Sequence, residues 1–251
     1  MVDILICGYG VVGQNIQEVL RRADNLNIDI CDKYKNIFDF DKNKKYDFCY
    51  ICVDTPIIKD DLNDISEIIN VLENINADIY ILKSTVLPGT TKELIRQFGK
   101  KIVFSPEYYG NTQHCNDFDF NFSILGGNKE DCLKVQQMLQ NVYNATHKFS
   151  ITDSTTAELV KYMENSFLAT KVSFCSSFWE TCNKLNINYE DVRELFILDP
   201  RINASHTFIH NNKPYWDSHC LNKDVVAIAE TFNNEFLKNM ISYNQKNMKK
   251  Y

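Results

Sequence analysis

Three glycines near the start of the chain constrain its fold more than any other feature. Gly8, Gly10 and Gly13 follow the apolar run 4–7 and precede the segment 15–23, whose apolar residues have helical spacing. In a strand–turn–helix unit the first glycine permits a tight turn, the second lets a pyrophosphate approach the backbone, and the third lets helix and strand pack closely. The helix N-terminus then offers free N–H groups to the phosphates. The pattern therefore predicts a dinucleotide site, and a glycine turn without a dinucleotide stays the alternative.

An acidic residue, Asp32, ends the next predicted strand 19 residues after Gly13. A carboxylate at this point accepts hydrogen bonds from the 2′-hydroxyl of a ribose and repels a 2′-phosphate, so it favours NAD over NADP. Lys33 and Lys35 beside it weaken this preference. The residues between the glycines are expected to contact the cofactor as well, namely Tyr9, Val11 and Val12.

Short apolar runs alternate with helical patterns over the first 150 residues. The runs predict strands at 4–7, 28–31, 48–53, 79–83 and 101–105, and the helical patterns lie at 15–23, 62–75 and 91–98. Continuous short apolar runs are typical of strands buried on both faces. Repeated strand–helix–strand order predicts a Rossmann-type, doubly wound parallel sheet of the α/β class. We assign residues 1–150 to this NAD-binding domain.

The strand pattern ends after residue 149, and long helices are predicted instead. Thr155 and Glu158 have the spacing of a capping box, which predicts a connecting helix over 155–185. One stripe of it is expected to be buried, namely Val160, Met163, Phe167, Phe174, Phe178, Cys182 and Leu185. A second helix is predicted over 223–244 with the stripe Val226, Ala229, Phe232, Phe236 and Met240. Residues 151–251 therefore form a mostly helical second domain in this interpretation.

The composition excludes several classes of protein. With 44% apolar and 24% charged residues the chain is typical of a globular protein. The net charge of −6 argues against nucleic acid as a partner, and no apolar run is long enough for a membrane span. The start of the chain lacks the apolar region of a signal peptide, and an odd number of cysteines, nine, favours free thiols. We expect a cytoplasmic protein.

Further polar strings stand where strands or helices are expected to begin or end. They are Val53-Asp54-Thr55-Pro56, Lys83-Ser84-Thr85, Ser105-Pro106-Glu107-Tyr108, the segment 157–169 with Lys161 and Asn165, Asp199-Pro200-Arg201, and His219-Cys220-Leu221-Asn222-Lys223-Asp224. In this order and spacing the chain resembles the UDP-glucose/GDP-mannose 6-dehydrogenase family over nearly its whole length. That resemblance implies oxidation of a nucleotide-sugar C6 alcohol, UDP-glucose or similar, to a carboxylate with two NAD⁺ and a cysteine nucleophile.

The resemblance also implies roles for individual residues. Cys220 is the nucleophile, Glu107 an acid/base residue, and Asp224 orients or activates water. Lys161 and Asn165, spaced for one helical face, form an oxyanion site. Further cofactor contacts come from Val53, Thr55, Pro56, Ser84 and Thr85, the last beside the nicotinamide. Substrate contacts come from Glu107, Tyr108, Lys161, Asn165, Arg201 and Lys223. Because the family arginine at Arg201 reaches the sugar of a neighbouring subunit, a homodimer is expected, and we place its contact on Phe167, Phe174 and Phe178.

The sequence also departs from the family pattern. A Gly-Gly pair before the cysteine is replaced by Asp217 and Ser218, a proline after it by Asn222, and an acidic residue after Glu107 by Asn111. Family members also continue into a further α/β domain that is expected to be lacking here, since the sequence ends at Tyr251. These departures leave the sugar undetermined.

Two other functions stay open at this point. One is a two-electron hydroxyacid-type dehydrogenase, which shares the domain layout and a helical Lys–Asn pair but needs no thiol. The other is a degenerate protein that binds NAD without turnover. A zinc site at His206, His210, His219 and Cys220 is disfavoured because such spacings are common by chance. We therefore expect no metal, and we expect Cys49-x-x-Cys52 to pack in the core.

Overall fold

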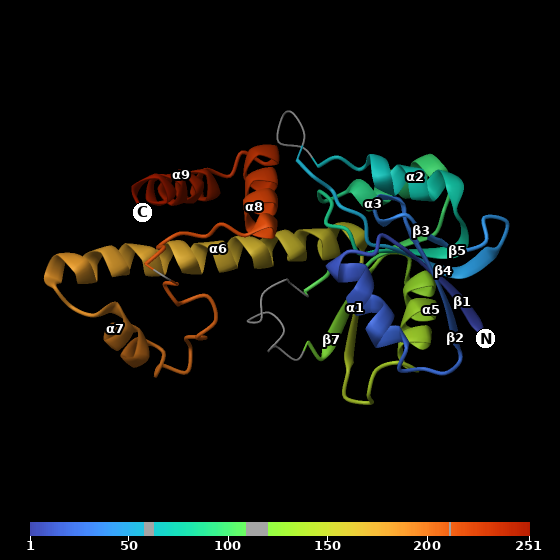
Figure 1. Ribbon diagram of the computed structural model, residues 1–251, viewed down its shortest axis with the longest axis horizontal. Helices are drawn as coiled ribbons and strands as arrows, with labels where there is room; N and C mark the ends of the chain where they lie inside the picture. The colour runs from blue at the N-terminus through green and yellow to red at the C-terminus, as the bar shows by residue number, and fades with distance from the viewer. Residues whose placement is uncertain (58–62, 109–119, 211) are drawn as a thin grey trace. The chain divides into compact units, whose positions relative to one another are not determined.

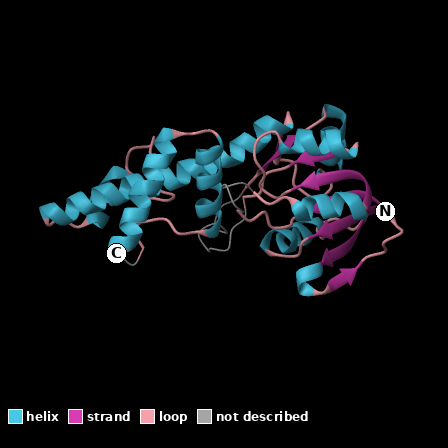
Figure 2. Ribbon diagram, turned by 90° about the horizontal axis from the view of Figure 1, so that it is seen from above, coloured by secondary structure: helices cyan, strands magenta, loops and turns pink. Residues whose placement is uncertain are grey.

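The computed structural model describes residues 1–57, 63–108, 120–210 and 212–251. The chain divides into two compact units. The first contains Met1–Pro56 and Asn63–Lys161, and the second contains Tyr162–Tyr251. Strands are confined to the first unit, and the described part of the second consists of helices and loops (Figure 2).

The first unit is built on one eight-stranded sheet of order β3-β2-β1-β4-β5-β6-β7-β8. The strands are β1 (Val2–Cys7), β2 (Leu26–Asp32), β3 (Ile37–Asp39), β4 (Lys45–Ile51), β5 (Asn76–Leu82), β6 (Ile102–Phe104), β7 (Phe122–Gly126) and β8 (Lys148–Thr152). The pairs β2–β3 and β6–β7 are antiparallel, and the other pairs are parallel. The predicted doubly wound sheet is confirmed, with β3, β7 and β8 as strands that the sequence pattern missed.

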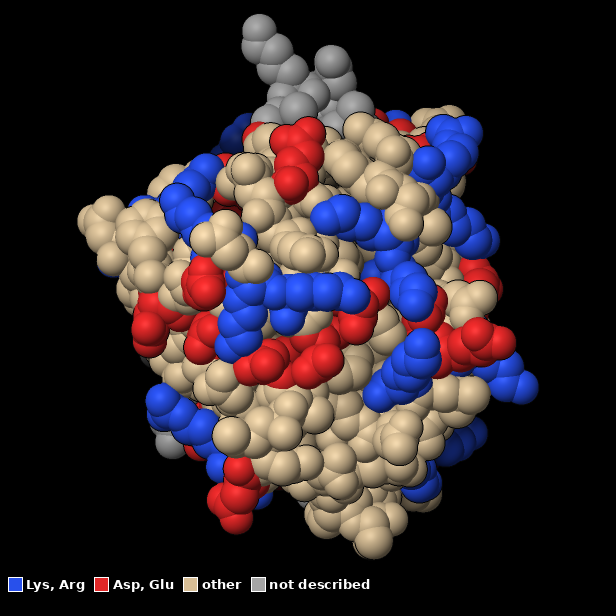
Figure 3. Space-filling view, turned by 90° about the vertical axis from the view of Figure 1, so that its right-hand side faces the viewer, with Lys and Arg blue, Asp and Glu red and all other residues tan. Residues whose placement is uncertain are grey.

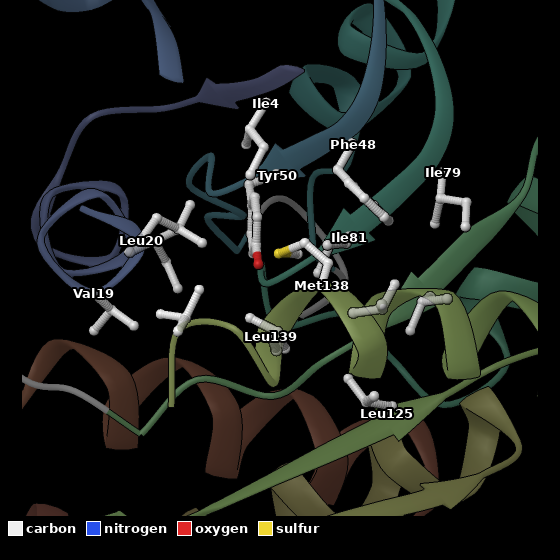
Figure 4. Packing of buried hydrophobic residues seen from close by; sticks show 14 of the residues in the cluster. Ile4, Val19, Leu20, Phe48, Tyr50, Ile79, Ile81, Leu125, Met138 and Leu139 are labelled. Carbon is white, nitrogen blue, oxygen red and sulfur yellow. The ribbon is translucent and has the colours of Figure 1, made fainter. Parts of the chain in front are cut away.

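Helices cover both faces of this sheet. In Figure 1, α1 (Val11–Leu20) and α5 (Lys129–Leu139) lie on one face, and α2 (Ser66–Asn74) and α3 (Thr90–Phe98) lie on the other. Successive residues of β1 point to opposite faces: Ile4 and Ile6 pack toward α1 and α5, and Leu5 packs toward α2 and α3. Figure 4 shows the first of these cores, where Met138 lies beside Tyr50 and Ile81. Burial on both faces explains why these strands read as continuous apolar runs.

Charged side chains of both signs mix on the outer surface of the first unit. Figure 3 shows Lys and Arg interspersed with Asp and Glu on one face of the described chain. Within this unit Lys44 pairs with Asp3 at 2.7 Å and with Asp29 at 3.2 Å, and Lys45 pairs with Asp78. Mixed charges of this kind give no single-sign field on that face.

In the described residues that follow β8, the chain forms four helices. They are α6 (Ser154–Leu185), α7 (Tyr189–Phe196), α8 (His219–Thr231) and α9 (Glu235–Lys250). The prediction of one helix over 223–244 is wrong, because the chain breaks between α8 and α9. Asn233 takes a left-handed φ of 49°, and the side chain of Asn234 accepts a hydrogen bond from the Leu237 N–H at 3.2 Å, which caps α9. Asparagine tolerates this conformation and caps helices well, so two in succession favour a break.

The start of α6 also differs from the prediction. Thr155 lies inside the helix, and Asp153 caps it by accepting hydrogen bonds from the N–H and hydroxyl of Thr156 at 3.2 and 2.5 Å. Glu158 is fully buried and caps α3 instead, accepting from the N–H groups of Gly89 at 2.6 Å and Thr91 at 2.8 Å. Burial raises the pKa of Glu158 above its ordinary value. The predicted capping box is therefore wrong, although the helix it predicted is present.

The predicted apolar stripe of α6 is mostly exposed in the single chain. Five of its seven residues are exposed, namely Met163, Phe167, Phe174, Phe178 and Leu185, whereas Cys182 is buried. The stripe predicted for the later helix is only partly buried, since Phe232 and Phe236 are exposed while Ala229 and Met240 are buried. The expectation of two fully buried stripes is wrong for this chain by itself. No helix in the described ranges has the length and apolar character needed to cross a membrane.

Candidate functional site

The turn between β1 and α1 needs glycine at two positions. Gly8 has a φ of +90°, and a Cβ there would come within 2.5 Å of the Cys52 carbonyl oxygen. A Cβ on Gly13 would lie 2.0 Å from the Gly8 carbonyl oxygen. Both clashes are with backbone, which cannot move aside, so a side chain at Gly8 would push the turn away from the residues after β4, and one at Gly13 would push α1 away from the turn.

Gly10 is different, because a Cβ on it would meet no atom within 4 Å. Gly10 is the N-cap of α1, no side chain caps that helix, and its first turn carries no acidic residue. The uncapped N–H groups and the helix dipole make this terminus suited to an anion. Space at Gly10 and an open helix end are what a pyrophosphate requires, so the residues present fit a dinucleotide.

The structure places Asp32 beside this turn. Its Oδ2 accepts a hydrogen bond from the Tyr9 N–H at 2.7 Å, and its Oδ1 accepts from the N–H groups of Tyr34 at 2.9 Å and Lys35 at 3.0 Å. The Lys35 ammonium donates to the Tyr9 carbonyl at 2.7 Å. These contacts fix the carboxylate at the carboxyl end of β2, where a ribose would bind.

The residues after β4 and β5 are joined to one another. The Thr55 hydroxyl donates to the Thr85 carbonyl at 2.8 Å, and the Ser84 hydroxyl donates to the Val53 carbonyl at 2.6 Å. Thr55 and Ser84 are buried, and Pro56 is exposed. The structure thus brings together the residues predicted to form this side of the cofactor site.

Glu107 follows β6 and is held by a buried lysine that our sequence reasoning gave no role. Its Oε2 lies 3.3 Å from Nζ of Lys83, and its Oε1 accepts from the Tyr108 N–H at 2.8 Å. Lys83 also donates to the Pro106 carbonyl at 3.1 Å. The position of Lys83 at the end of an apolar strand could have predicted this pair, because a lysine that ends a buried strand needs an acidic partner.

Tyr108 connects Glu107 to Lys161 within the first unit. The Lys161 ammonium lies 5.3 Å from the centroid of the Tyr108 ring, within reach of a cation–π interaction. Among the described residues, Phe120 and Phe122 also lie beside that ring, at 5.4 and 5.0 Å between centroids. Three predicted site residues therefore lie close together here, while Asn111 lies outside the described residues.

A second group of predicted site residues lies in the second unit. Asn165 of α6 donates from Nδ2 to Oδ2 of Asp224 at 2.6 Å, and both residues are buried. The other Asp224 oxygen pairs with the Lys223 ammonium at 2.8 Å. Asp224 lies in the second turn of α8 rather than in its opening turn, since the helix already begins at His219. The amide and the ammonium hold the Asp224 carboxylate in one orientation.

Cys220 is the second residue of α8, and it is the exposed cysteine of the described chain. The Ser218 hydroxyl caps α8 by accepting from the Leu221 N–H at 3.3 Å, and Asp217 accepts from the Asn222 side chain at 2.9 Å. Three of the four residues that depart from the family pattern, Asp217, Ser218 and Asn222, thus lie at the start of this helix. Cys49 is buried by contrast, and burial raises the pKa values of Cys31 and Cys132 to about 11.

Arg201, in the second unit, pairs with a residue close to it in the chain. Its exposed guanidinium forms a fork on the Asp199 carboxylate, donating from Nε at 3.0 Å and from Nη2 at 2.6 Å. This hydrogen-bonded arginine lowers the pKa of Asp199. In the described ranges no three His, Cys, Asp or Glu side chains lie together in a way that could hold a metal ion.

Two long segments of the chain match models of one protein family. Residues 5–147 match the NAD binding domain of the UDP-glucose/GDP-mannose dehydrogenase family, and residues 155–247 match its central domain. The first match confirms the predicted NAD cofactor. A relative in Rickettsia conorii named UDP-glucose 6-dehydrogenase is 32% identical over 219 residues, which is 82% of this chain and 49% of that protein.

Two solved structures share the fold. A UDP-glucose dehydrogenase from Pyrobaculum islandicum aligns with a TM-score of 0.80 at 19% identity, covering 98% of this chain and 68% of that one. A 3-hydroxyisobutyrate dehydrogenase from Mycobacterium tuberculosis aligns with a TM-score of 0.72 at 14% identity, covering 98% and 93%. The chain spans about half the length of the curated relatives it matches. The two family models and the sequence relatives together show that the chain belongs to the UDP-glucose/GDP-mannose dehydrogenase family.

Proposed function

We propose that this chain oxidises the C6 alcohol of a nucleotide sugar such as UDP-glucose to the uronic acid, with NAD as cofactor and Cys220 as nucleophile. The observation that carries the proposal is the arrangement around α8. An exposed thiol stands in its first turn, and four residues later Asp224 is tied to Asn165 of α6 at 2.6 Å. Family membership and the names of the sequence relatives support the same chemistry.

The first oxidation takes a hydride and a proton from the C6 alcohol. NAD⁺ bound at the glycine turn would accept the hydride. Lys161 and Asn165 lie one turn apart on α6, and together they would stabilise negative charge on the C6 oxygen. The product of this step is an aldehyde.

The second oxidation needs the aldehyde to be held covalently. The Cys220 sulfur attacks the aldehyde carbon, forming a C–S bond and a thiohemiacetal. Loss of a second hydride, which a second NAD⁺ would accept, and of the hydroxyl proton, which Glu107 would take as the acid/base residue, converts that adduct to a thioester. Water oriented by Asp224 then breaks the C–S bond, which releases the carboxylate and returns the thiol.

The experiment measures NADH released from limiting UDP-glucose in the presence of excess NAD⁺. We expect two NADH per sugar and formation of the uronic acid. Cys220→Ala should form no acid but still bind NAD⁺, because the glycine turn is unchanged. Cys182→Ala, which alters a buried thiol of α6, is the matched control and should keep the two-NADH yield.

Two results would contradict the proposal. One NADH per sugar with an active Cys220→Ala variant would show a two-electron dehydrogenase of the hydroxyacid type. NAD⁺ binding without NADH from any nucleotide sugar would show a binding protein without turnover.

A further inference from the structure

The inward face of α9 changes from apolar to amide side chains along the helix. Its buried residues are Leu237, Met240, Ile241, Asn244 and Asn247. The two asparagines are only 2% and 4% exposed. Asparagine is a weak helix former, and burying its amide costs free energy unless the amide is hydrogen-bonded. Packing alone therefore does not account for these two residues.

Both asparagines bond to the backbone of the segment that leads into α8. Asn244 accepts from the Trp216 N–H through Oδ1 and donates to the Trp216 carbonyl through Nδ2, each at 2.9 Å. Asn247 donates from Nδ2 to the Pro214 carbonyl at 3.0 Å. The spacing of three residues puts both amides on one side of α9. The two side-chain amides supply hydrogen-bond partners for the backbone groups of this segment, as a neighbouring strand would.

The same segment is fixed to α6 as well. The indole Nε1 of Trp216, which is 5% exposed, donates to the Ser173 hydroxyl at 3.0 Å. The end of α9 is tied to α6 through Glu180, which pairs with Lys250 at 2.8 Å and accepts from the Tyr251 hydroxyl at 3.3 Å. Trp216 is therefore held by α6 through its side chain and by α9 through its backbone.

This attachment lies just before Cys220. Trp216 precedes the Ser218 N-cap by two residues and Cys220 by four. The fixed backbone at 214–216 and the cap at Ser218 together set where α8 starts and where its first turn points. We infer that Asn244 and Asn247 are positioning residues that hold the thiol of Cys220 for reaction with the aldehyde. The inference rests on the proposed role of Cys220, and neither asparagine touches the reacting atoms.

The test compares Asn244→Ala with Asn247→Ala and with Gln245→Ala, an exposed position of the same helix. A small displacement of a reacting group costs rate rather than binding, so Asn244→Ala should lower kcat by about 10- to 100-fold with little change in KM and in NAD⁺ affinity. Asn247→Ala should have a smaller effect in the same direction because it removes one hydrogen bond instead of two. Gln245→Ala should behave as the parent protein.

Two further measurements do not depend on turnover. Hydrogen exchange of the peptide 213–218 should be faster in Asn244→Ala and unchanged in Gln245→Ala. The second measurement is the rate of Cys220 alkylation by iodoacetamide, followed by mass spectrometry at several pH values. The pH at which this rate is half of its maximum, the alkylation midpoint, should be higher in Asn244→Ala than in the parent protein. A thiolate at an intact helix N-terminus is stabilised by the helix dipole, and a loosened first turn loses that stabilisation.

The outcomes separate this inference from the proposed function. Faster exchange with an unchanged kcat and an unchanged alkylation midpoint would overturn the positioning role, even if Cys220 is required for acid formation. If Cys220→Ala stays active, the proposed function fails, and with it the positioning role, while exchange would still show whether the asparagines fix the segment. Should Asn244→Ala not fold, Asn247→Ala carries the test, and parent-like kcat and alkylation in that variant would count against the inference.

Discussion

Nζ of Lys83 lies 3.3 Å from Oε2 of Glu107, and the two side chains are only 10% and 8% exposed. The ammonium also donates to the carbonyl of Pro106, the residue before Glu107. A buried charge persists where an opposite charge and hydrogen bonds compensate it. Lys83 therefore keeps Glu107 in place at the carboxyl end of β6, where the proposed chemistry requires a carboxylate.

Removing only the lysine should destabilise the protein strongly. We expect Lys83→Met to lower the free energy of unfolding by about 3–5 kcal/mol, because the buried carboxylate loses its cation. Adding Glu107→Gln should restore much of this loss, since the pair is then neutral. Urea unfolding of the two single variants and the double variant measures the coupling. Lys45→Met, at an exposed ion pair with Asp78, is the control and should change the free energy of unfolding far less than Lys83→Met does. Additive effects of the two buried substitutions would contradict the prediction.

Asp32 should decide between the two nicotinamide cofactors. NAD⁺ at about a hundredfold excess over Kd should stabilise the protein by about 2.7 kcal/mol, and NADP⁺ at the same concentration should stabilise it less. Asp32→Ser should narrow this difference, because the carboxylate that repels a 2′-phosphate is gone. Thermal unfolding with each cofactor is the measurement. Asp24→Asn, at an exposed acidic residue before β2, should leave the difference as it was. Equal stabilisation of the parent protein by both cofactors would show that Asp32 does not select NAD.

Asp153 rather than Thr155 should behave as the N-cap of α6. Hydrogen bonds from Thr156 lower the pKa of Asp153 to about 2 from an ordinary 3.8. Because the folded-state pKa is lowered, its stabilisation is present above pH 3.8 and is lost as the pH falls through about 2. Asp153→Ala should therefore cost about 1 kcal/mol at neutral pH, and the difference from the parent should shrink in acid. Denaturant unfolding at several pH values tests this, with Thr155→Ala as the near-neutral control. If Thr155→Ala lowers the free energy of unfolding more than Asp153→Ala does, Thr155 is the N-cap, as the predicted capping box requires.

The exposed aromatic residues of α6 point to association between two copies of the chain. Phe167, Phe174 and Phe178 are 63%, 51% and 47% exposed. Exposed apolar area of this kind is typical of an interaction surface, and we propose a two-fold dimer through it. Light scattering at low micromolar concentration should show a dimer, and the double substitution Phe174→Asp with Phe178→Asp should show a monomer. Leu133→Asp, at an exposed leucine of α5, should leave the dimer intact. A monomeric parent protein would exclude the proposal.

The sequence by itself predicted the features that depend on neighbouring residues. Gly8 and Gly13 are required by contacts within one strand–turn–helix unit, so their spacing carried the prediction of that unit. The central strands β1, β4 and β5 are buried on both faces and read as apolar runs. Strands β3 and β8 lie at the edges of the sheet, and β7 and β8 are only partly buried, so no such run marks them.

Tertiary structure alone decided which polar groups meet. Glu158 has the spacing of a local cap, yet its carboxylate reaches Gly89 and Thr91, far earlier in the chain. Lys83 pairs with Glu107, and Asn244 bonds to the Trp216 backbone. Both partners are distant in the sequence, so the spacing of residues along one helix or strand does not predict them. Periodicity reports which face of an element is apolar, whereas hydrogen bonds between distant residues depend on how the folded elements pack.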